Sequence, residues 1–295
     1  MQDFSFYSPE QKMNHPLYDL KGVEVGFKRD DLIHPFISGN KWRKLKYNLK
    51  KAQETNKSHL VTFGGAWSNH ILATACAGAT FGYSTEAFIR GEIVDNPVLT
   101  LCQLFGMKLH FVSREQYRDK HRLFADLPDT DNAYFIDEGG WGIEATKGCR
   151  EIITELSVTY SHIFCAAGTG TTAAGIAMAL SENNLSSKLH VIPVLKDGSF
   201  IADEMQKLCA PMGQTVLHTD YHFGGYAKTK SELIDFIKDF VAKTGILIEP
   251  TYTGKALYAL HDLIKQDTFQ SGERILFVHT GGLTGLLGML DRFKM

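Results

Sequence analysis

The sequence has few cysteines, and none are arranged as metal-binding or redox motifs usually are. There are five in 295 residues, an odd number, with no Cys-x-x-Cys pair. Structural zinc sites and redox motifs commonly depend on such closely spaced pairs. We expect reduced cysteines in a cytoplasmic protein, and no metal site. The cysteines are Cys76, Cys102, Cys149, Cys165 and Cys209.

An excess of one charge is also missing, as is any long apolar run. Lys and Arg total 31 and Asp and Glu total 33, so the formal net charge is −2. Proteins that bind phosphate backbones or anionic lipid usually carry a positive excess. No apolar run approaches the roughly 18 residues of a spanning helix, and Met1-Gln2-Asp3-Phe4 does not resemble the start of a signal peptide. We expect neither nucleic acid nor membrane as a partner, and a cytoplasmic location.

The hydrophobic content of 44% and the charged content of 22% are typical of a globular protein with a sizeable core. From residue 59 onward, short β-branched or aromatic runs alternate with segments of helical periodicity, which predicts a parallel sheet covered on both faces. There is no low-complexity linker. We expect a small α/β domain at 46–137 within a larger domain formed by 1–45 and 138–295. The predicted strands are 59–63, 84–89, 108–112, 133–136, 162–166, 189–193 and 274–279. The predicted helices are 71–81, 97–105, 145–156, 172–180, 231–243, 255–266 and a terminal one.

A turn rich in glycine and threonine follows the strand at 162–166 and leads into a helix. It contains Gly168, Thr169, Gly170, Thr171 and Thr172. Glycines allow backbone N–H groups to turn inward, hydroxyls add donors, and a helix N-terminus adds partial positive charge. The turn is therefore a predicted anion site. It does not end in Gly-Lys-Ser or Gly-Lys-Thr, which disfavours ATP or GTP hydrolysis.

Two alternatives remain for this turn. The spacing Gly168-x-Gly170-x-x-Ala173 matches a relaxed dinucleotide fingerprint, and Asp197 follows the next strand. The turn could also serve only to close a buried strand. Three threonines within four positions favour a terminal phosphomonoester.

Two more turns have the same setting, since each follows a predicted strand and opens a helix. One runs from Gly64 to His70 and the other from His279 to Gly285. Ligand crevices in α/β sheets form at strand ends. We expect the three turns to share one crevice.

Lys41 lies in the run Ser38-Gly39-Asn40-Lys41-Trp42-Arg43-Lys44. A lysine at a helix start is ordinarily solvated. Here Asn40 can cap the helix, and the charges of Arg43 and Lys44 are expected to lower the pKa of the Lys41 amine. A neutral amine is the nucleophile that Schiff-base chemistry needs.

Taken together, these motifs resemble the fold type II pyridoxal phosphate enzymes, in the branch of D-cysteine desulfhydrases and 1-aminocyclopropane-1-carboxylate deaminases. The matching motifs occur in the family's order and cover nearly the whole chain. They are Lys28-Arg29-Asp30-Asp31, Ser38-Gly39-Asn40-Lys41-x-Arg43-Lys44-Leu45, Gly64-Gly65-x-x-Ser68-Asn69-His70, Gly168-Thr169-Gly170-Thr171-Thr172-Ala173-Ala174-Gly175, Pro250-Thr251-Tyr252-Thr253-Gly254-Lys255 and His279-Thr280-Gly281-Gly282.

The resemblance implies an α/β fold like that of the tryptophan synthase β-subunit, with two open, mostly parallel twisted sheets and flanking helices. It also implies a homodimer, pyridoxal 5'-phosphate as cofactor and a small amino acid as substrate. The roles that it implies are Schiff-base lysine for Lys41, phosphate binding for Gly168 to Thr172 with Lys44, ring-hydroxyl contact for Asn69, ring-nitrogen contact for Thr280, substrate-carboxylate contact for Ser68, ring stacking for Tyr252, and a second active-site tyrosine for Tyr226.

Two positions distinguish the branches of this family. The cyclopropane deaminases typically have glutamate and leucine where this chain has Thr253 and Thr280. A carboxylate beside the ring nitrogen keeps it protonated, and the protonated ring withdraws electrons strongly from the substrate. A threonine hydroxyl offers only a neutral hydrogen bond, so the ring withdraws electrons less strongly. This favours α,β-elimination, with Lys41 as base, giving pyruvate, ammonia and sulfide from D-cysteine. The alternatives are a cyclopropane deaminase releasing 2-oxobutanoate and ammonia, a dinucleotide-dependent dehydrogenase, and a catalytically silent binding protein.

Overall fold

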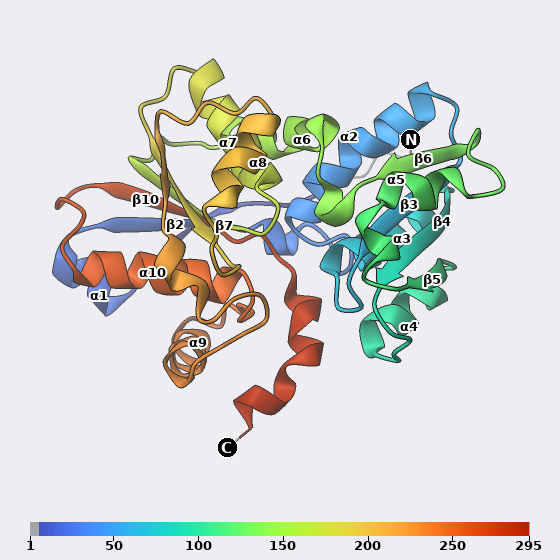
Figure 1. Ribbon diagram of the computed structural model, residues 1–295. Helices are drawn as coiled ribbons and strands as arrows, with labels where there is room; N and C mark the ends of the chain where they lie inside the picture. Colours follow the sequence, from blue (N-terminus) through green and yellow to red (C-terminus); the bar gives the residue numbers. More distant parts are fainter. Residues whose placement is uncertain (1–5, 295) are drawn as a thin grey trace.

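Two sheets, each with helices packed against it, organise the chain (Figure 1). The computed structural model describes residues 6–294, so the first residues, on which the prediction of no signal peptide rests, lie outside the described residues. Helices α2 (Asn40–Glu54) and α6 (Ile143–Thr154) pack on each other between the two sheets. The predicted fold class is confirmed.

The larger sheet has six strands in the order β1-β2-β10-β7-β8-β9. Only β1 is antiparallel to its neighbour, and the remaining pairs are parallel. Strands that are adjacent in this sheet, such as β2 and β10, are far apart in the sequence and run parallel. Crossover connections between parallel strands therefore bring the carboxyl ends of these strands to the same edge of the sheet. The strands are β1 (Glu10–Met13), β2 (Glu24–Lys28), β7 (His162–Ala167), β8 (Lys188–Pro193), β9 (Thr215–Leu217) and β10 (Arg274–Val278).

The smaller sheet has four parallel strands in the order β5-β4-β3-β6. They are β3 (His59–Gly64), β4 (Ser84–Arg90), β5 (Lys108–Val112) and β6 (Ala133–Ile136). All four lie inside the predicted small domain. The predicted limit between residues 45 and 46 falls within α2, and the domain division stays a prediction.

The other helices cover the faces of the sheets. They are α1 (Pro16–Lys21), α3 (Asn69–Phe81), α4 (Pro97–Leu104), α5 (Lys120–Ala125), α7 (Thr171–Glu182), α8 (Phe200–Lys207), α9 (Ser231–Thr244) and α10 (Thr253–Lys265). The predicted terminal helix consists instead of two 3₁₀ segments, Leu283–Gly288 and Leu290–Phe293. Glycines at 285 and 288 oppose a regular α-helix there, because glycine loses the most backbone entropy on ordering.

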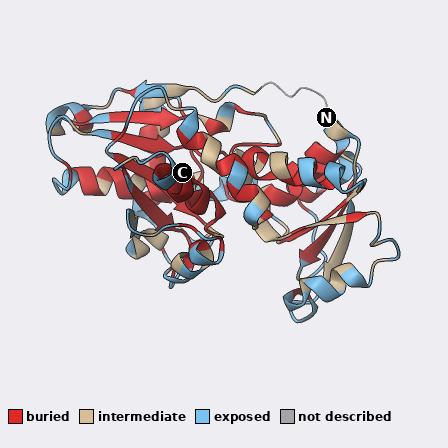
Figure 2. Cartoon of the chain, turned by 90° about the horizontal axis from the view of Figure 1, so that it is seen from above, coloured by how far each residue is buried: buried red, intermediate tan, exposed pale blue. Residues whose placement is uncertain are grey.

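Strand β7 is apolar along nearly its whole length because both of its faces are buried. Ile163 and Cys165 face the core that contains α6 and α7, whereas Phe164 and Ala166 face the core that contains α9 and α10. Side chains alternate between the faces of a strand, and both faces of this sheet are covered. Figure 2 shows the resulting concentration of buried residues in the strands.

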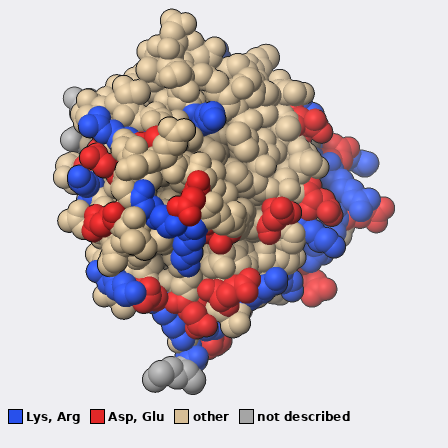
Figure 3. All heavy atoms as spheres, turned by 90° about the vertical axis from the view of Figure 1, so that its left-hand side faces the viewer, with Lys and Arg blue, Asp and Glu red and all other residues tan. Residues whose placement is uncertain are grey.

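The face drawn in Figure 3 shows no large area of a single charge. On the face seen in Figure 3, acidic and basic side chains are interspersed. Among residues 6–294, no helix is both long and apolar enough to cross a membrane. Within the same range, no cluster of three or more His, Cys, Asp or Glu side chains is arranged to hold a metal ion.

Three histidines form a hydrogen-bonded chain across neighbouring strands of the larger sheet. His162 Nδ1 lies 2.9 Å from His190 Nε2, and His190 Nδ1 lies 2.8 Å from His218 Nε2. Glu273, which can only accept when ionised, lies 3.3 Å from His162 Nε2. His162 and His190 therefore donate from Nε2 and accept at Nδ1, and His218 donates from Nε2. A second proton on His162 or His190 would remove an acceptor and break the chain.

We expect acid to destabilise the protein through this chain. Burial, followed by the charges of His218 and His162, lowers the pKa of His190 to about 3. The pKa of His190 is lower in the folded protein than its unfolded value of about 6.5. Neutral His190 therefore contributes its full share of the folding stability above about pH 6.5, and this share is lost as the pH falls toward 3. The loss attributable to His190 should be about 2 kcal/mol at pH 5.

Denaturant unfolding at pH 7 and pH 5 checks this prediction. His190→Gln should lose less stability between the two pH values than the wild type. The matched control is His121→Gln, at an exposed histidine, which should behave like the wild type. An equal loss in His190→Gln and in the wild type would contradict the prediction.

Candidate active site

A cavity of about 450 Å³ lies where the carboxyl ends of strands from both sheets meet. The three glycine-containing turns all contribute to its wall, which confirms that they share one crevice. Every residue to which the resemblance assigns a role lines this cavity. These residues are Lys41, Lys44, Ser68, Asn69, Gly168, Thr169, Gly170, Thr171, Thr172, Tyr226, Tyr252 and Thr280.

Lys41 is placed by the docking of α2 onto the end of β10. Gly39 has φ of 61°, and a Cβ built there would lie 1.9 Å from the carbonyl oxygen of Thr280. Only glycine fits this approach. The Asn40 N–H donates to the same oxygen over 3.2 Å, and Asn40 Nδ2 donates to Thr172 Oγ1 over 3.0 Å. The Asn40 side chain therefore links the turns, and the expected cap by Asn40 is wrong, because the helix begins at Asn40 with Gly39 as its cap residue.

The electrostatics of Lys41 differ in part from the expectation. Burial is the first cause that lowers the pKa of its amine well below the usual value, and the charge of Lys44 is the second. Arg43 is not a cause, because its guanidinium pairs with Asp30 and Glu155. In the described part of the chain, no carboxylate lies within 4.0 Å of either lysine amine that lines the cavity. Neither amine therefore has a carboxylate partner that would hold it in the protonated form.

The anion cradle is built from the β7–α7 turn and Lys44. Gly170 immediately precedes α7, whose first N–H groups have no partners within the helix. The hydroxyls of Thr169 and Thr171 lie 3.3 Å apart. Lys44 Nζ donates to the Gly139 carbonyl over 3.0 Å, which brings the loop after β6 against the cradle. This arrangement suits a phosphate group.

The start of α3 forms a second anion-binding element. Ser68 caps this helix, with Oγ accepting from the Ile71 N–H at 3.4 Å. The Thr284 hydroxyl donates to Asn69 Oδ1 over 2.8 Å and so fixes the amide. The N–H groups of the first turn have no acceptors within the helix. A carboxylate fits this position.

The side chain of His70 is a functional group that we did not single out from the sequence. The Thr62 hydroxyl donates to the Ile136 carbonyl over 2.9 Å, so it accepts from His70 Nε2 at 2.8 Å. Nδ1 of the buried ring is thus an acceptor, and it has no partner among the described residues. Burial, followed by the charges of Lys41 and Lys44, lowers the pKa of His70 well below its usual value. His70 is therefore a neutral acceptor at the cavity wall.

The rings of the two predicted tyrosines, Tyr226 and Tyr252, pack edge to face beside the phosphate turn. Their rings are 6.0 Å apart with an interplanar angle of 73°. A Cβ at Gly168 would lie 3.0 Å from Tyr252 Cε1, so the Tyr252 ring packs directly on the phosphate turn. Burial raises the pKa of Tyr226, and it raises that of Tyr252 well above the usual value. Both phenols keep their protons and can act as donors.

Thr253 does not line the cavity, which differs from its expected place beside the cofactor. Its hydroxyl lies 3.3 Å from the buried Glu249 carboxylate. That carboxylate accepts from the N–H groups of Thr251, Tyr252 and Thr253 at 2.6, 2.7 and 2.7 Å. Glu249 thus caps the start of α10 and holds Tyr252. Sequence reasoning missed this cap because the acceptor lies four residues before the helix.

The outer wall of the cavity contains an ion pair that carries no local sequence signal. Arg90, at the end of β4, and Glu138, just after β6, approach to 3.5 Å. The Arg90 guanidinium also lies 5.1 Å from the centre of the Tyr117 ring. Trp67 and Phe200 add aromatic surface to the wall. This rim supplies both charges at the entrance.

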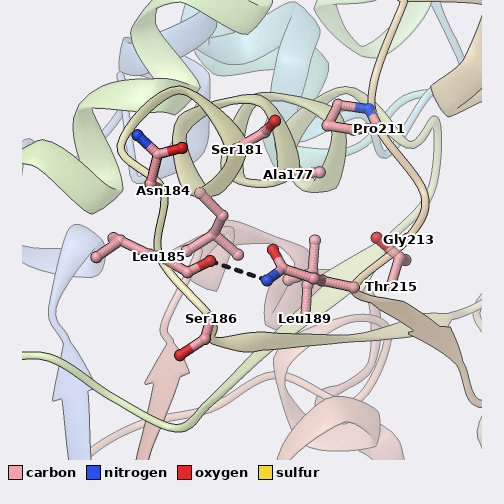
Figure 4. A pocket seen from close by; sticks show the side chains of 11 residues that line it. Ala177, Ser181, Asn184, Leu185, Ser186, Leu189, Pro211, Gly213 and Thr215 are labelled. Atoms are coloured by element: carbon pink, nitrogen blue, oxygen red, sulfur yellow. Dashed lines mark hydrogen bonds between the residues drawn. The ribbon is translucent and has the colours of Figure 1, made fainter.

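A second hollow, of about 400 Å³, lies apart from this cavity between the end of α7 and the start of β8 (Figure 4). Gln214 Nε2 donates to the Leu185 carbonyl across it at 2.9 Å. Its lining contains no acidic, basic, histidine or cysteine side chain. It offers no acid–base chemistry.

Comparison with known proteins assigns the class. A family described as "Pyridoxal-phosphate dependent enzyme" matches residues 13–281, so the chain belongs to this family and uses pyridoxal phosphate. The chain is 32% identical to a bifunctional D-cysteine desulfhydrase/1-aminocyclopropane-1-carboxylate deaminase, mitochondrial, of Arabidopsis thaliana, over 92% of this chain and 75% of that protein. It is 30% identical to a putative 1-aminocyclopropane-1-carboxylate deaminase of Pyrococcus horikoshii, over 92% and 88%.

A solved structure supports the same assignment. The crystal structure of an ACC deaminase homologue superposes with a TM-score of 0.88 at 29% identity, covering 98% of this chain and 94% of that one. The resemblance inferred from the motifs is confirmed. Asp197, on which the dinucleotide alternative depended, is exposed and does not line the cavity.

The cavity itself fits the cofactor. Two lysines that line it have no carboxylate within salt-bridge distance in the described chain, and both amines have lowered pKa values, from burial first. The N–H groups at the start of α7 and the threonine hydroxyls suit a phosphate ester, while a neutral amine suits an aldehyde. A phosphorylated aldehyde satisfies both requirements.

Proposed function

We propose that the protein is a lyase that removes a β-substituent from a small amino acid, as D-cysteine desulfhydrases do, releasing pyruvate, ammonia and sulfide from D-cysteine. The observation that carries this proposal is the neutral Thr280 at the end of β10, where it lines the cavity. The buried carboxylate before α10, Glu249, does not line the cavity and already accepts from three backbone N–H groups. The cavity therefore offers a hydroxyl at this position instead of a carboxylate.

The residues of the chain have distinct tasks in this proposal. The turn from Gly168 to Thr172 and Lys44 hold the phosphate, with Asn69 near the ring hydroxyl and Thr280 near the ring nitrogen. Bound pyridoxal phosphate supplies a ring that withdraws electrons from the substrate α-carbon. Ser68 and the first N–H groups of α3 bind the substrate carboxylate. Lys41 Nζ, whose pKa is lowered by burial and so shifts toward the neutral amine, removes the α-proton.

The tyrosines complete the acid–base set. Since the pKa values of Tyr226 and Tyr252 are raised, neither phenol serves as a base near neutral pH. Each can donate a hydrogen bond or proton to a departing thiolate. Elimination needs this donor, because the electron pair of the broken bond goes to sulfur.

The second candidate function is deamination of 1-aminocyclopropane-1-carboxylate, an activity that the names of both relatives contain, although the Arabidopsis protein is named for D-cysteine desulfhydration as well. A keto-acid assay over D-cysteine, L-cysteine, D-serine, β-chloro-D-alanine and the cyclopropane substrate separates the two functions. We expect pyruvate from D-cysteine with sulfide in equal amount. Predominant 2-oxobutanoate from the cyclopropane substrate would replace elimination with deamination. Release from none of them would favour the catalytically silent alternative.

We also propose a cytoplasmic homodimer. The proposal of a dimer rests on the resemblance to the family. The proposal of a cytoplasmic location is supported by the five unpaired cysteines, which are consistent with a reducing compartment. Light scattering of the purified protein tests the dimer by giving either twice the mass of the 32.9 kDa chain or the mass of the chain itself.

A further inference from the structure

The backbone on both sides of Tyr226 is strained. Phe223 and Ala227 have φ values of 52° and 54°, although neither is glycine, and Gly224 and Gly225 have φ of 97° and 116°. A Cβ disfavours this left-handed region, so such residues persist only where the surroundings hold them. Something outside the segment must therefore stabilise it.

The buried ammonium of Lys255 provides that stabilisation. From α10, Lys255 Nζ donates to the carbonyls of Gly225, His222 and Val194 over 2.7, 2.8 and 3.2 Å. Two of these carbonyls border the strained residues, and the third follows β8. An ammonium has three hydrogens, and all are used.

Carbonyl oxygens are the only hydrogen-bond partners of this ammonium among the described residues. No carboxylate lies within 4.0 Å of Lys255 Nζ among residues 6–294, although the side chain is fully buried. Burial lowers the pKa of Lys255 to about 8, while Glu249 opposes the shift. An unpaired buried charge is costly, and methionine would fill the same space without that cost. The reason for a lysine at position 255 is therefore the three carbonyl groups that its ammonium binds.

We infer that Lys255 is a positioning residue whose ammonium gathers the carbonyls of His222 and Gly225 and thereby holds Tyr226 in the cofactor cavity. Lys255 does not itself line that cavity. The inference rests on the proposed role of Tyr226. It adds a requirement that the elimination mechanism does not contain, namely a fixed positive charge behind the tyrosine.

The first test is hydrogen exchange on the holoenzyme. In Lys255→Met, amides at 222–227 should exchange at least about 10-fold faster, with β7 and β10 unchanged, because opening is local. The matched control is Lys265→Met, an exposed lysine on the same helix, which should match the wild type. Unchanged exchange at 222–227 would overturn the inference, and so would faster exchange throughout the larger sheet.

Chemical rescue tests the charge itself. Lys255→Ala removes three carbons and the ammonium, which n-propylammonium replaces. We expect n-propylammonium to restore slow exchange at 222–227, and n-propanol, of similar shape but neutral, to have no effect. Equal rescue by both compounds would overturn the requirement for a charge, as would rescue by neither.

The link to Tyr226 is tested by a double-mutant cycle. Lys255→Met should lower kcat about 100-fold with little change in KM, as expected for a misplaced proton donor. In a Tyr226→Phe background, the same change should cost less than about threefold, because coupled residues are not additive. Full additivity would contradict the link. Exchange and rescue need no turnover, so they stay decisive if the proposed reaction fails.

Discussion

Lys41→Ala is expected to abolish keto-acid release, lowering kcat by at least about 1,000-fold, because one change removes both the anchoring amine and the base. Two lysines line the cavity, and the structure distinguishes them. Lys44 Nζ is engaged by the Gly139 carbonyl at 3.0 Å. Neither amine has an ion pair among the described residues, but Lys41 Nζ also has no hydrogen-bond partner there, and its pKa is lowered well below the usual value.

Borohydride reduction followed by peptide mass spectrometry checks the anchor. The reduced cofactor should be found on Lys41 in the wild type and on no lysine in Lys41→Ala. The control variant is Lys50→Ala, at an exposed position on the same helix, which should retain both cofactor and turnover. Reduced cofactor on Lys44 of the wild type would reverse the two assignments.

Arg43→Met is expected to destabilise the protein by about 3–5 kcal/mol, the usual cost of leaving buried charges without their partner. Arg43 is fully buried, with Nε and Nη2 donating to Asp30 at 2.6 and 2.7 Å. It also donates to Glu155 at 3.0 and 2.9 Å, and Lys28 approaches the same carboxylate at 2.8 Å. This network joins β2, α2 and α6 beneath Lys41.

A second pair between the same two helices gives the control. Lys46 and Glu151 are 2.7 Å apart, with 31% and 21% of their side chains exposed. Because such a pair is partly screened by water, Lys46→Met should cost less than about 1 kcal/mol. Denaturant unfolding of both variants measures the difference. Similar losses in the two would show that burial does not set the strength of the Arg43 network.

The sequence predicted the central elements well because their signals are local. Short runs of apolar and β-branched residues predict β3 and β7 within one residue, since such a run is read from neighbours along the chain. The elements not predicted were mainly short ones, such as the three-residue β9, whose exposed pattern has no apolar period. The glycine turns could likewise be found, because glycine and threonine mark them directly.

By itself, then, the sequence determined the fold class, the family, the cofactor and many of the residues around the cavity, but not His70, Arg90 or Glu138. Only the tertiary structure decided which charges act on which groups. Arg43 was expected to influence Lys41, but Asp30 and Glu155 take up its charge. In the sequence, Lys255 is only part of a motif, whereas the structure shows that its ammonium binds three carbonyls from distant parts of the chain. The physical reason is that periodicity and turn propensity depend on adjacent residues, whereas Coulomb forces and hydrogen bonds depend on distances that chain folding alone creates.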